Sequence, residues 1–235
     1  MLIFAHRGAS GLAPENTLKA IQLALEESSD AIEIDLHEVD GKIVILHDRW
    51  LHSTTSGKGL VHKQRFEYIE QLTAGQGEKI PTLDEIFSLV AGRCQINLEL
   101  KGIENTDLLL DYIDNAIAKK QLKTEDLILS SFDHQLLYRI NQLRPEFLIG
   151  ALAAAIPLSY AEFASQLNAY SIHLNVNFIS QAFVKDAKKR GLKVFVYTVD
   201  EPEDILMMKA LEVDGIFANF PARARRFCLK NKDSG

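Results

Sequence analysis

An α/β barrel of eight parallel strands alternating with helices is the fold class that this sequence predicts. Eight short segments rich in apolar and β-branched residues recur along the 235-residue chain, as buried parallel strands do. Segments with helical periodicity separate them, which is the pattern of βα units. The length also suits a single (β/α)8 TIM barrel, so the chain need not be divided into two domains.

The expected strands are distributed over the whole chain. They cover Leu2–Ala5, Ala31–Leu36, Gln95–Leu100, Leu127–Leu129, Phe147–Leu152, Ser171–Leu174, Lys193–Tyr197 and Gly215–Ala218. A further β segment, Lys42–Leu46, closely follows the second strand and predicts a hairpin with it. An open, doubly wound sheet has the same local pattern, and no nucleotide-binding glycine motif distinguishes the two arrangements.

Amphipathic segments between the strands predict the helices. In the first of them, one helical face is formed by Leu18, Ile21 and Leu25. Asn16 or Thr17 can cap this helix, and a capping role is the interpretation we favour for Asn16. Thr82 and Glu85 have the spacing of a capping box and predict the start of a later helix.

One long irregular segment, residues 48–80, interrupts the alternation after the second strand and its hairpin. It is rich in Ser, Thr and Gly, and a loop of this length inside a compact domain is usually functional or capping. We therefore expect one domain over residues 1–235, with 48–80 as an insert or cap near the active-site face. Residues 231–235 are expected to fray.

Composition indicates a globular protein without an anionic polymer as its partner. The net charge is −6, which argues against nucleic acid. A basic cluster near the C-terminus is interpreted as the solvated end of a last helix, and consists of Arg223, Arg225, Arg226, Lys230 and Lys232. Two distant cysteines, no signal-peptide pattern and no apolar run long enough to span a bilayer predict a cytoplasmic location. The pattern does not indicate an oligomeric state.

Three carboxylates are expected to meet at the carboxyl ends of neighbouring strands. Glu33 and Asp35 lie two apart on one strand and therefore share a face, and Glu99 lies on the next strand of the barrel. Catalytic side chains of such barrels come from these strand ends. Oxygen ligands alone suit a hard cation, so we predict a Mg²⁺ or Ca²⁺ site; zinc would favour more His or Cys.

Cations and histidines are expected beside these carboxylates. Arg7 and Lys101 follow the first and third strands, and with a divalent ion they would form a clamp for a phosphate. His6 and His47 suit the acid and base that phosphodiester hydrolysis requires. Phe132, after the fourth strand, is expected either to line the site or to pack in the core.

Five motifs together carry a resemblance to a known family. They are His6-Arg7-Gly8, Pro14-Glu15-Asn16-Thr17, Glu33-x-Asp35, His47-Asp48 and Glu99-x-Lys101. In this order they resemble the glycerophosphodiester phosphodiesterase family over nearly the whole chain. The resemblance implies a TIM barrel, a divalent metal, and release of glycerol 3-phosphate and an alcohol from a small glycerophosphodiester.

The chain departs from that family's pattern at several positions, mostly in its second half. Tyr197 stands where the family commonly has Trp, and it can still offer a flat wall to the substrate. Ala218-Asn219 replaces the usual Thr-Asp after the last strand, and Ser53 replaces a common Arg. These changes affect the expected alcohol group more than the expected reaction, because the proposed metal and histidine residues are intact.

The function we expect is metal-dependent hydrolysis of glycerophosphodiesters. Glu33, Asp35 and Glu99 would hold the ion, and His6 and His47 would exchange protons with the nucleophile and the leaving alcohol. One alternative is a related barrel phosphodiesterase or lyase acting on lysophospholipids or phosphoinositides, which should have an apolar or basic rim. Another is a catalytically silent protein that binds phosphodiesters.

Overall fold

Eight parallel strands close into a barrel in the computed structural model, which describes residues 1–229. β1 pairs in parallel with both β2 and β9, and these two pairings complete the ring. The predicted (β/α)8 barrel is thereby confirmed, and the open-sheet alternative is wrong. β3 lies outside the ring as an antiparallel partner of β2, as the predicted hairpin requires.

The strands follow the predicted segments closely. They are β1 Leu2–His6, β2 Ala31–Val39, β3 Lys42–Ile45, β4 Gln95–Gly102, β5 Leu127–Ser131, β6 Leu148–Ala153, β7 Ser171–Asn175, β8 Lys193–Tyr197 and β9 Gly215–Ala218. The alternation of apolar and acidic residues in β2 shows why the prediction and the structure agree. Ile32, Ile34 and Leu36 are fully buried against the surrounding helices, while Glu33 and Asp35 alternate with them and face the barrel interior.

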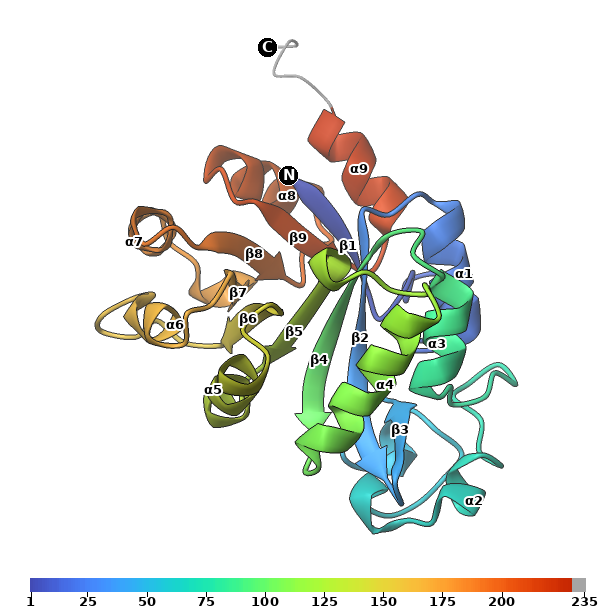
Figure 1. Cartoon of the computed structure of the whole chain (residues 1–235). Coiled ribbons are helices and arrows are strands. Elements are labelled where there is room, and N and C mark those ends of the chain that lie inside the picture. The colour runs from blue at the N-terminus through green and yellow to red at the C-terminus, as the bar shows by residue number, and fades with distance from the viewer. Residues whose placement is uncertain (230–235) are drawn as a thin grey trace.

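Helices surround the strands on the outside of the barrel (Figure 1). They are α1 Leu18–Glu26, α2 Phe66–Ile69, α3 Leu83–Val90, α4 Thr106–Ala118, α5 His134–Leu143, α6 Glu162–Gln166, α7 Gln181–Lys189, α8 Pro202–Ala210 and α9 Pro221–Leu229. Four short 3-10 turns, η1 Leu51–Ser53, η2 Val61–Lys63, η3 Thr124–Asp126 and η4 Val176–Phe178, complete the described elements. No helix within residues 1–229 is long and apolar enough to cross a membrane.

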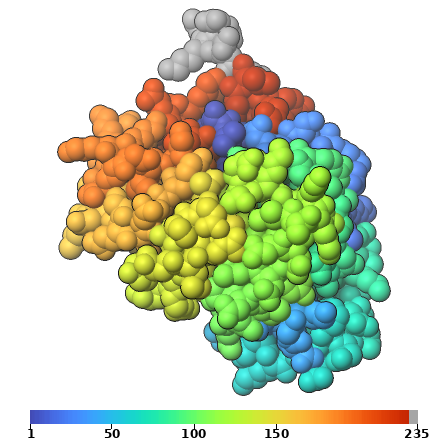
Figure 2. Space-filling model, viewed as in Figure 1, coloured from blue at the N-terminus to red at the C-terminus, as the bar shows by residue number. Residues whose placement is uncertain are grey.

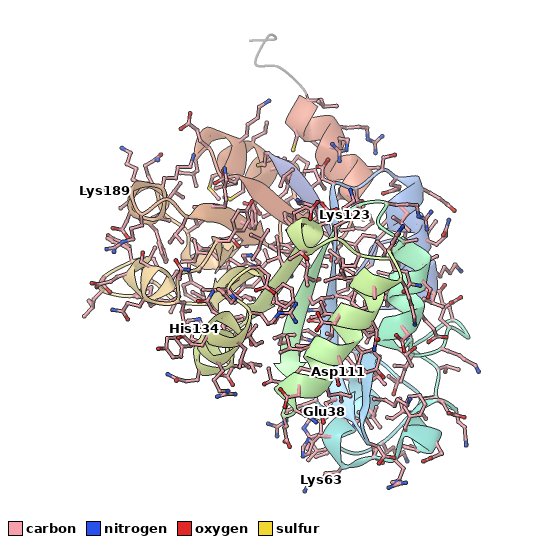
Figure 3. All side chains as sticks on the ribbon, viewed as in Figure 1. Glu38, Lys63, Asp111, Lys123, His134 and Lys189 are labelled. Carbon is pink, nitrogen blue, oxygen red and sulfur yellow. The ribbon has the colours of Figure 1, made fainter. Side chains whose placement is uncertain are left out.

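Side-chain hydrogen bonds fix several helix starts. The Thr17 hydroxyl accepts from the Ala20 amide and caps α1, so the capping role expected for Asn16 is wrong. The predicted capping box of Thr82 and Glu85 is confirmed at α3. Glu38, labelled beside the first turn of α4 in Figure 3, accepts from the backbone amides of residues 104 and 105.

Aromatic side chains fill the barrel interior. The ring of Phe4 lies 4.8 Å from that of Phe195 and 4.7 Å from that of Phe217, measured between centroids. All three side chains are almost fully buried. Because they come from β1, β8 and β9, this contact ties the first strand to the last two and supports closure of the ring.

The insert, residues 48–80, packs beside the hairpin of β2 and β3. It contains η1, η2 and α2, and Leu51, Val61 and Ile69 form an apolar cluster with residues of the hairpin. It occupies the lower edge of the molecule in Figures 1 and 2, away from the last helix. Its role as a cap over the site, and the extent of the domain, stay predictions. Lys230, Lys232 and residues 231–235 lie outside the described residues.

Candidate active site

A cavity of about 330 Å³ opens at the carboxyl ends of the barrel strands. One side of it is lined by charged residues and histidines from β1, β2, β4 and the end of the hairpin, namely His6, Arg7, Glu33, His47, Glu99 and Lys101. These are residues that the sequence places at strand ends. The structure therefore brings the predicted acidic, basic and histidine residues to one cavity.

The three predicted carboxylates form one cluster. Asp35 and Glu99 are neighbours in the parallel register of β2 and β4, and Glu33 lies two residues before Asp35. One oxygen from each of the three lies within 4.8 Å of the others. Glu33 and Glu99 line the cavity, whereas Asp35 lies behind them and is 1 % exposed.

This cluster fits a hard divalent cation. All three ligands are carboxylates, which Mg²⁺ and Ca²⁺ prefer. Oε1 of Glu33 is buried and has no hydrogen-bond partner within the described residues, so it is free to act as a metal ligand. Burying this oxygen away from water without a partner costs free energy. A bound cation would compensate that cost.

Two cations lie against the same carboxylates. Arg7 Nε is 3.2 Å from Asp35 Oδ2, and its Nη1 donates to Glu15 Oε1 at 2.9 Å. Lys101 Nζ lies 2.5 Å from Glu99 Oε1 and 3.5 Å from Asp35 Oδ1. The alternative of an exposed Glu99–Lys101 surface pair is wrong, because Glu99 is buried and both side chains line the cavity.

The electrostatic environment separates the three carboxyl groups. Burial raises the pKa of Glu33 well above its ordinary value, and the neighbouring charges of Asp35 and Glu99 raise it further. Burial and Asp35 likewise raise the pKa of Glu99. For Asp35, burial also acts upward, but Arg7 and Lys101 outweigh it and lower the pKa. Asp35 is therefore the securely ionised anion of the group.

The two histidines face the cavity with different partners. Nδ1 of His6 lies 2.8 Å from Oδ1 of Asn219, and Nδ1 of His47 lies 3.0 Å from Oδ1 of Asp48. Burial, reinforced by the charge of Arg7, lowers the pKa of His6 to about 4. His6 is consequently neutral near pH 7, as a proton acceptor must be.

A strained turn after β1 positions Arg7. Arg7 has φ of 56° and Gly8 has φ of 76°, both in the left-handed region. A Cβ atom on Gly8 would lie 2.6 Å from the backbone carbon of Ala20, so only glycine fits between this turn and α1. The turn directs the Arg7 amide to Glu33 Oε2 at 2.8 Å.

Asn16 holds the buried carboxylate from behind. Its Nδ2 donates to Asp35 Oδ2 at 2.9 Å, and its Oδ1 accepts from the Asp35 amide at 3.2 Å. Asn16 is almost fully buried, with φ of 58°. The local sequence suggests a cap because Asn is common there; nothing in it indicates a hydrogen-bonded partner nineteen residues away.

The other side of the cavity is uncharged. It is lined by Phe132, Leu152, Ala154, His173, Asn175, Tyr197, Thr198 and Phe217. The rings of Phe132 and Tyr197 meet edge to face, with centroids 6.2 Å apart. Phe132 and Tyr197 thus both line the cavity, and their contact with a substrate stays a prediction.

Two buried polar residues, Asn97 and His173, also line the cavity and are absent from the predicted set. Asn97 lies on β4 two residues before Glu99 and donates to Ser130 Oγ at 3.0 Å. His173 is fully buried on β7, and burial lowers its pKa to about 3. Asn97 shares strand parity with Glu99, a signal that could have identified it. His173 has no comparable signal.

The insert lines a neighbouring cavity of about 390 Å³. Arg49, Leu60 and His62 of the insert face Lys101 and Gly102 of β4 there. No residue within 49–80 lines the charged cavity of the candidate site. Lys101 lines both cavities, so the insert is adjacent to the candidate site through this side chain.

Comparison with known proteins places these features in a family. Residues 6–223 match the Glycerophosphoryl diester phosphodiesterase family. The chain belongs to this family. The predicted family resemblance and the prediction of an enzyme of this family are thereby confirmed.

Relatives and solved structures agree with this assignment. A glycerophosphodiester phosphodiesterase of Caldanaerobacter subterraneus subsp. tengcongensis is 36% identical, with 94% of each chain covered. One from Bacillus altitudinis is 31% identical over 94% of this chain and 96% of its own. A phosphodiesterase from Oleispira antarctica, solved in complex with the product sn-glycerol-3-phosphate, superposes with a TM-score of 0.90 at 31% identity, covering 98% of this chain and 97% of that one.

Proposed function

We propose that this chain hydrolyses glycerophosphodiesters to glycerol 3-phosphate and an alcohol, using a divalent cation and two histidines. The observation that carries the proposal is the convergence of Glu33, Asp35 and Glu99 with Arg7, Lys101, His6 and His47 at one cavity. The sn-glycerol-3-phosphate product in the Oleispira antarctica structure supports the same substrate class.

Charge balance supports a phosphodiester as the ligand. Glu33, Asp35 and Glu99, when ionised, exceed the two cations Arg7 and Lys101 by one negative charge. A divalent cation would reverse the balance to one positive charge, which matches the single negative charge of a phosphodiester. When bound, the cation would act as a Lewis acid on substrate oxygen and neutralise the carboxylates. Arg7 and Lys101 would then become available to the phosphate oxygens.

The histidines supply the proton transfers. His6, neutral near pH 7, accepts a proton from the attacking oxygen of the glycerol hydroxyl or water. His47, which lines the same cavity, donates a proton to the leaving alcohol oxygen, and the roles reverse if a cyclic phosphate is opened by water. The assignment of first base to His6 rests on its lowered pKa. Asp48 orients the His47 ring through Nδ1.

Release of glycerol 3-phosphate tests the proposal directly. Purified protein with Mg²⁺ or Ca²⁺ is incubated with glycerophosphocholine and glycerophosphoethanolamine, and glycerol 3-phosphate is measured enzymatically. We expect release that stops in excess chelator and returns with added cation. Equal release in chelator would contradict the metal requirement, and no release with either cation would contradict the proposed reaction.

One observation favours a second candidate substrate class, the lysophospholipids. Ile156 and Leu158, in the loop after β6, and Phe178, after β7, are exposed large apolar side chains. They follow Ala154 and Asn175, which line the uncharged side of the cavity. The acyl chain on the glycerol of such a substrate would therefore leave the site along this rim.

Two substrates that differ only by an acyl chain test this candidate. Rates with lysophosphatidylcholine and glycerophosphocholine are compared for wild type and Leu158→Asp. We expect the variant to lose about tenfold with the acylated substrate only, corresponding to roughly 1.4 kcal/mol. Leu206→Asp on α8 is the matched exposed control. Equal losses on both substrates, or no turnover of the acylated one by wild type, would contradict this candidate.

A further inference from the structure

Asn219, the residue after the last barrel strand, is linked by a hydrogen bond to His6 at the end of β1. Asn219 follows β9, and its Oδ1 lies 2.8 Å from Nδ1 of His6. Its Nδ2 donates to Asp200 Oδ2 at 2.6 Å, and its backbone amide donates to Asp200 Oδ1 at 2.8 Å. The amide group of Asn219 is therefore fixed between a carboxylate and an imidazole.

The chemistry of these partners determines which end of the amide faces His6. A carboxylate only accepts hydrogen bonds, so the end of Asn219 that meets Asp200 must be the NH₂ group. The end that meets His6 is then the carbonyl oxygen, which also only accepts. Nδ1 of His6 must accordingly carry the proton. In the neutral ring this leaves the lone pair on Nε2.

Other contacts hold the link rigid. Ser10 Oγ lies 2.7 Å from Oδ1 of the Asn219 side chain. The Gly11 amide donates to the backbone carbonyl oxygen of Asn219 at 2.9 Å. Nη2 of Arg223 on α9 donates to the backbone carbonyl of Asp200 at 2.8 Å. The loops after β1 and β8 and the start of α9 thus meet at Asn219.

We infer that Asn219, oriented by Asp200, is a positioning residue that selects the Nδ1-protonated tautomer of His6 and so presents Nε2 as the proton acceptor. The inference rests on the proposed function for the role of His6 in turnover, but the tautomer itself does not depend on it. Thr-Asp is the pattern expected at residues 218–219 from the family resemblance. A carboxylate at 219 would meet that of Asp200, so the amide is matched to its partner in this chain.

The first test removes the carbonyl acceptor. For Asn219→Ala we expect kcat to fall 10- to 100-fold with KM changed less than threefold, because the link contacts a proton acceptor and not the substrate. Nitrogen-15 NMR of the imidazole should show Nδ1 of His6 protonated in the wild type and no longer held in that state in the variant. Asn115→Ala, exposed on α4, is the matched control. Unchanged kcat with His6 still protonated at Nδ1 would overturn the inference.

The second test exchanges the two partners. Asn219→Asp alone places two carboxylates together, and we expect it to lower kcat at least tenfold. The double variant Asp200→Asn with Asn219→Asp restores a donor facing an acceptor, so we expect kcat within about threefold of wild type and a protonated Nδ1. A double variant no better than the single one, with both folded by circular dichroism, would overturn the inference.

Failure of the proposed function is separable from failure of this inference. If the wild type releases no glycerol 3-phosphate, the proposed reaction is wrong, while the NMR comparison still decides the tautomer. A wild-type His6 that is protonated at Nε2 instead would overturn the link even if the enzyme is fully active.

Discussion

The two sides of the active-site cavity differ in almost every physical property. Within residues 1–229, every charged residue that lines the cavity lies on the side built from β1–β4. On that side three carboxylates, Arg7 and Lys101 form one network of direct contacts. The side built from β5–β9 carries aromatic, aliphatic and neutral polar groups, including the edge-to-face pair of Phe132 and Tyr197. One barrel therefore places a dense ionic network opposite an uncharged wall.

This difference suggests a division of labour between the two sides. Charged groups bind and polarise a phosphate, whereas an uncharged aromatic wall excludes water and contacts the organic part of a substrate. Changes on the charged side should therefore affect turnover, and changes on the uncharged side should affect KM and substrate preference.

The largest effect is expected at the histidines of the charged side. His6→Ala or His47→Ala should lower kcat about 100- to 10,000-fold, because each removes a proton transfer from the transition state. The measurement is steady-state release of glycerol 3-phosphate from glycerophosphocholine. His52→Ala, exposed in the insert, serves as the control. Retention of more than a tenth of wild-type kcat would remove the altered histidine from catalysis.

The next effect concerns metal binding and can be measured without turnover. Glu33→Gln keeps the shape of the side chain but removes one anionic ligand, so we expect the affinity for Mg²⁺ or Ca²⁺ to fall about 10- to 100-fold. Titration calorimetry gives the affinity, and Glu125→Gln, exposed before β5, is the control. Wild-type protein that binds neither cation would contradict the proposed site.

Most of the fold is predictable because it follows from local periodicity. Strand parity alone places Glu33 and Asp35 on one face of their strand. In the structure this face of β2 points into the barrel. Closure is different. It requires β1 to pair with β9, some two hundred residues away, and an open sheet has the same local signals.

Two of the missed site residues, Asn219 and His173, share this dependence on closure. Asn219 meets His6 only because β9 lies beside β1, and His173 reaches the cavity from β7 across the barrel. Asn16 is similar on a shorter scale, since its amide binds Asp35 through a folded loop. Residue type and spacing within one segment carry no information on such contacts.

A moderate effect is expected on the uncharged side. Phe132→Ala should raise KM for glycerophosphocholine about five- to tenfold and change kcat less than threefold, since we expect the ring to contact the organic part of the substrate and not the phosphate. Tyr138→Ala is a well-matched control, because Tyr138 is 48% exposed and Phe132 is 47% exposed. A fall in kcat comparable to that of His6→Ala would contradict the division between the two sides.

The last effect is on stability and concerns the buried histidine of the uncharged side. His173 contacts Ser171 Oγ at 2.9 Å and the rings of Phe195 and Phe217, and burial lowers its pKa from 6.5 to about 3. Its folded pKa lies below its unfolded pKa, so the unfolded chain binds the extra proton between these values. The stability contributed by neutral His173 is therefore present above pH 6.5 and is lost as the pH falls below it.

A comparison of two pH values isolates this contribution. Between pH 7 and pH 5, without added metal, the free energy of unfolding of the wild type should fall about 2 kcal/mol more than that of His173→Leu. Urea titrations at both pH values give the two differences. Other buried histidines, such as His37, contribute equally to both proteins and cancel. Equal falls in the two proteins would mean that His173 gains its proton in the folded state as readily as in the unfolded chain, and that the uncharged side tolerates a charge after all.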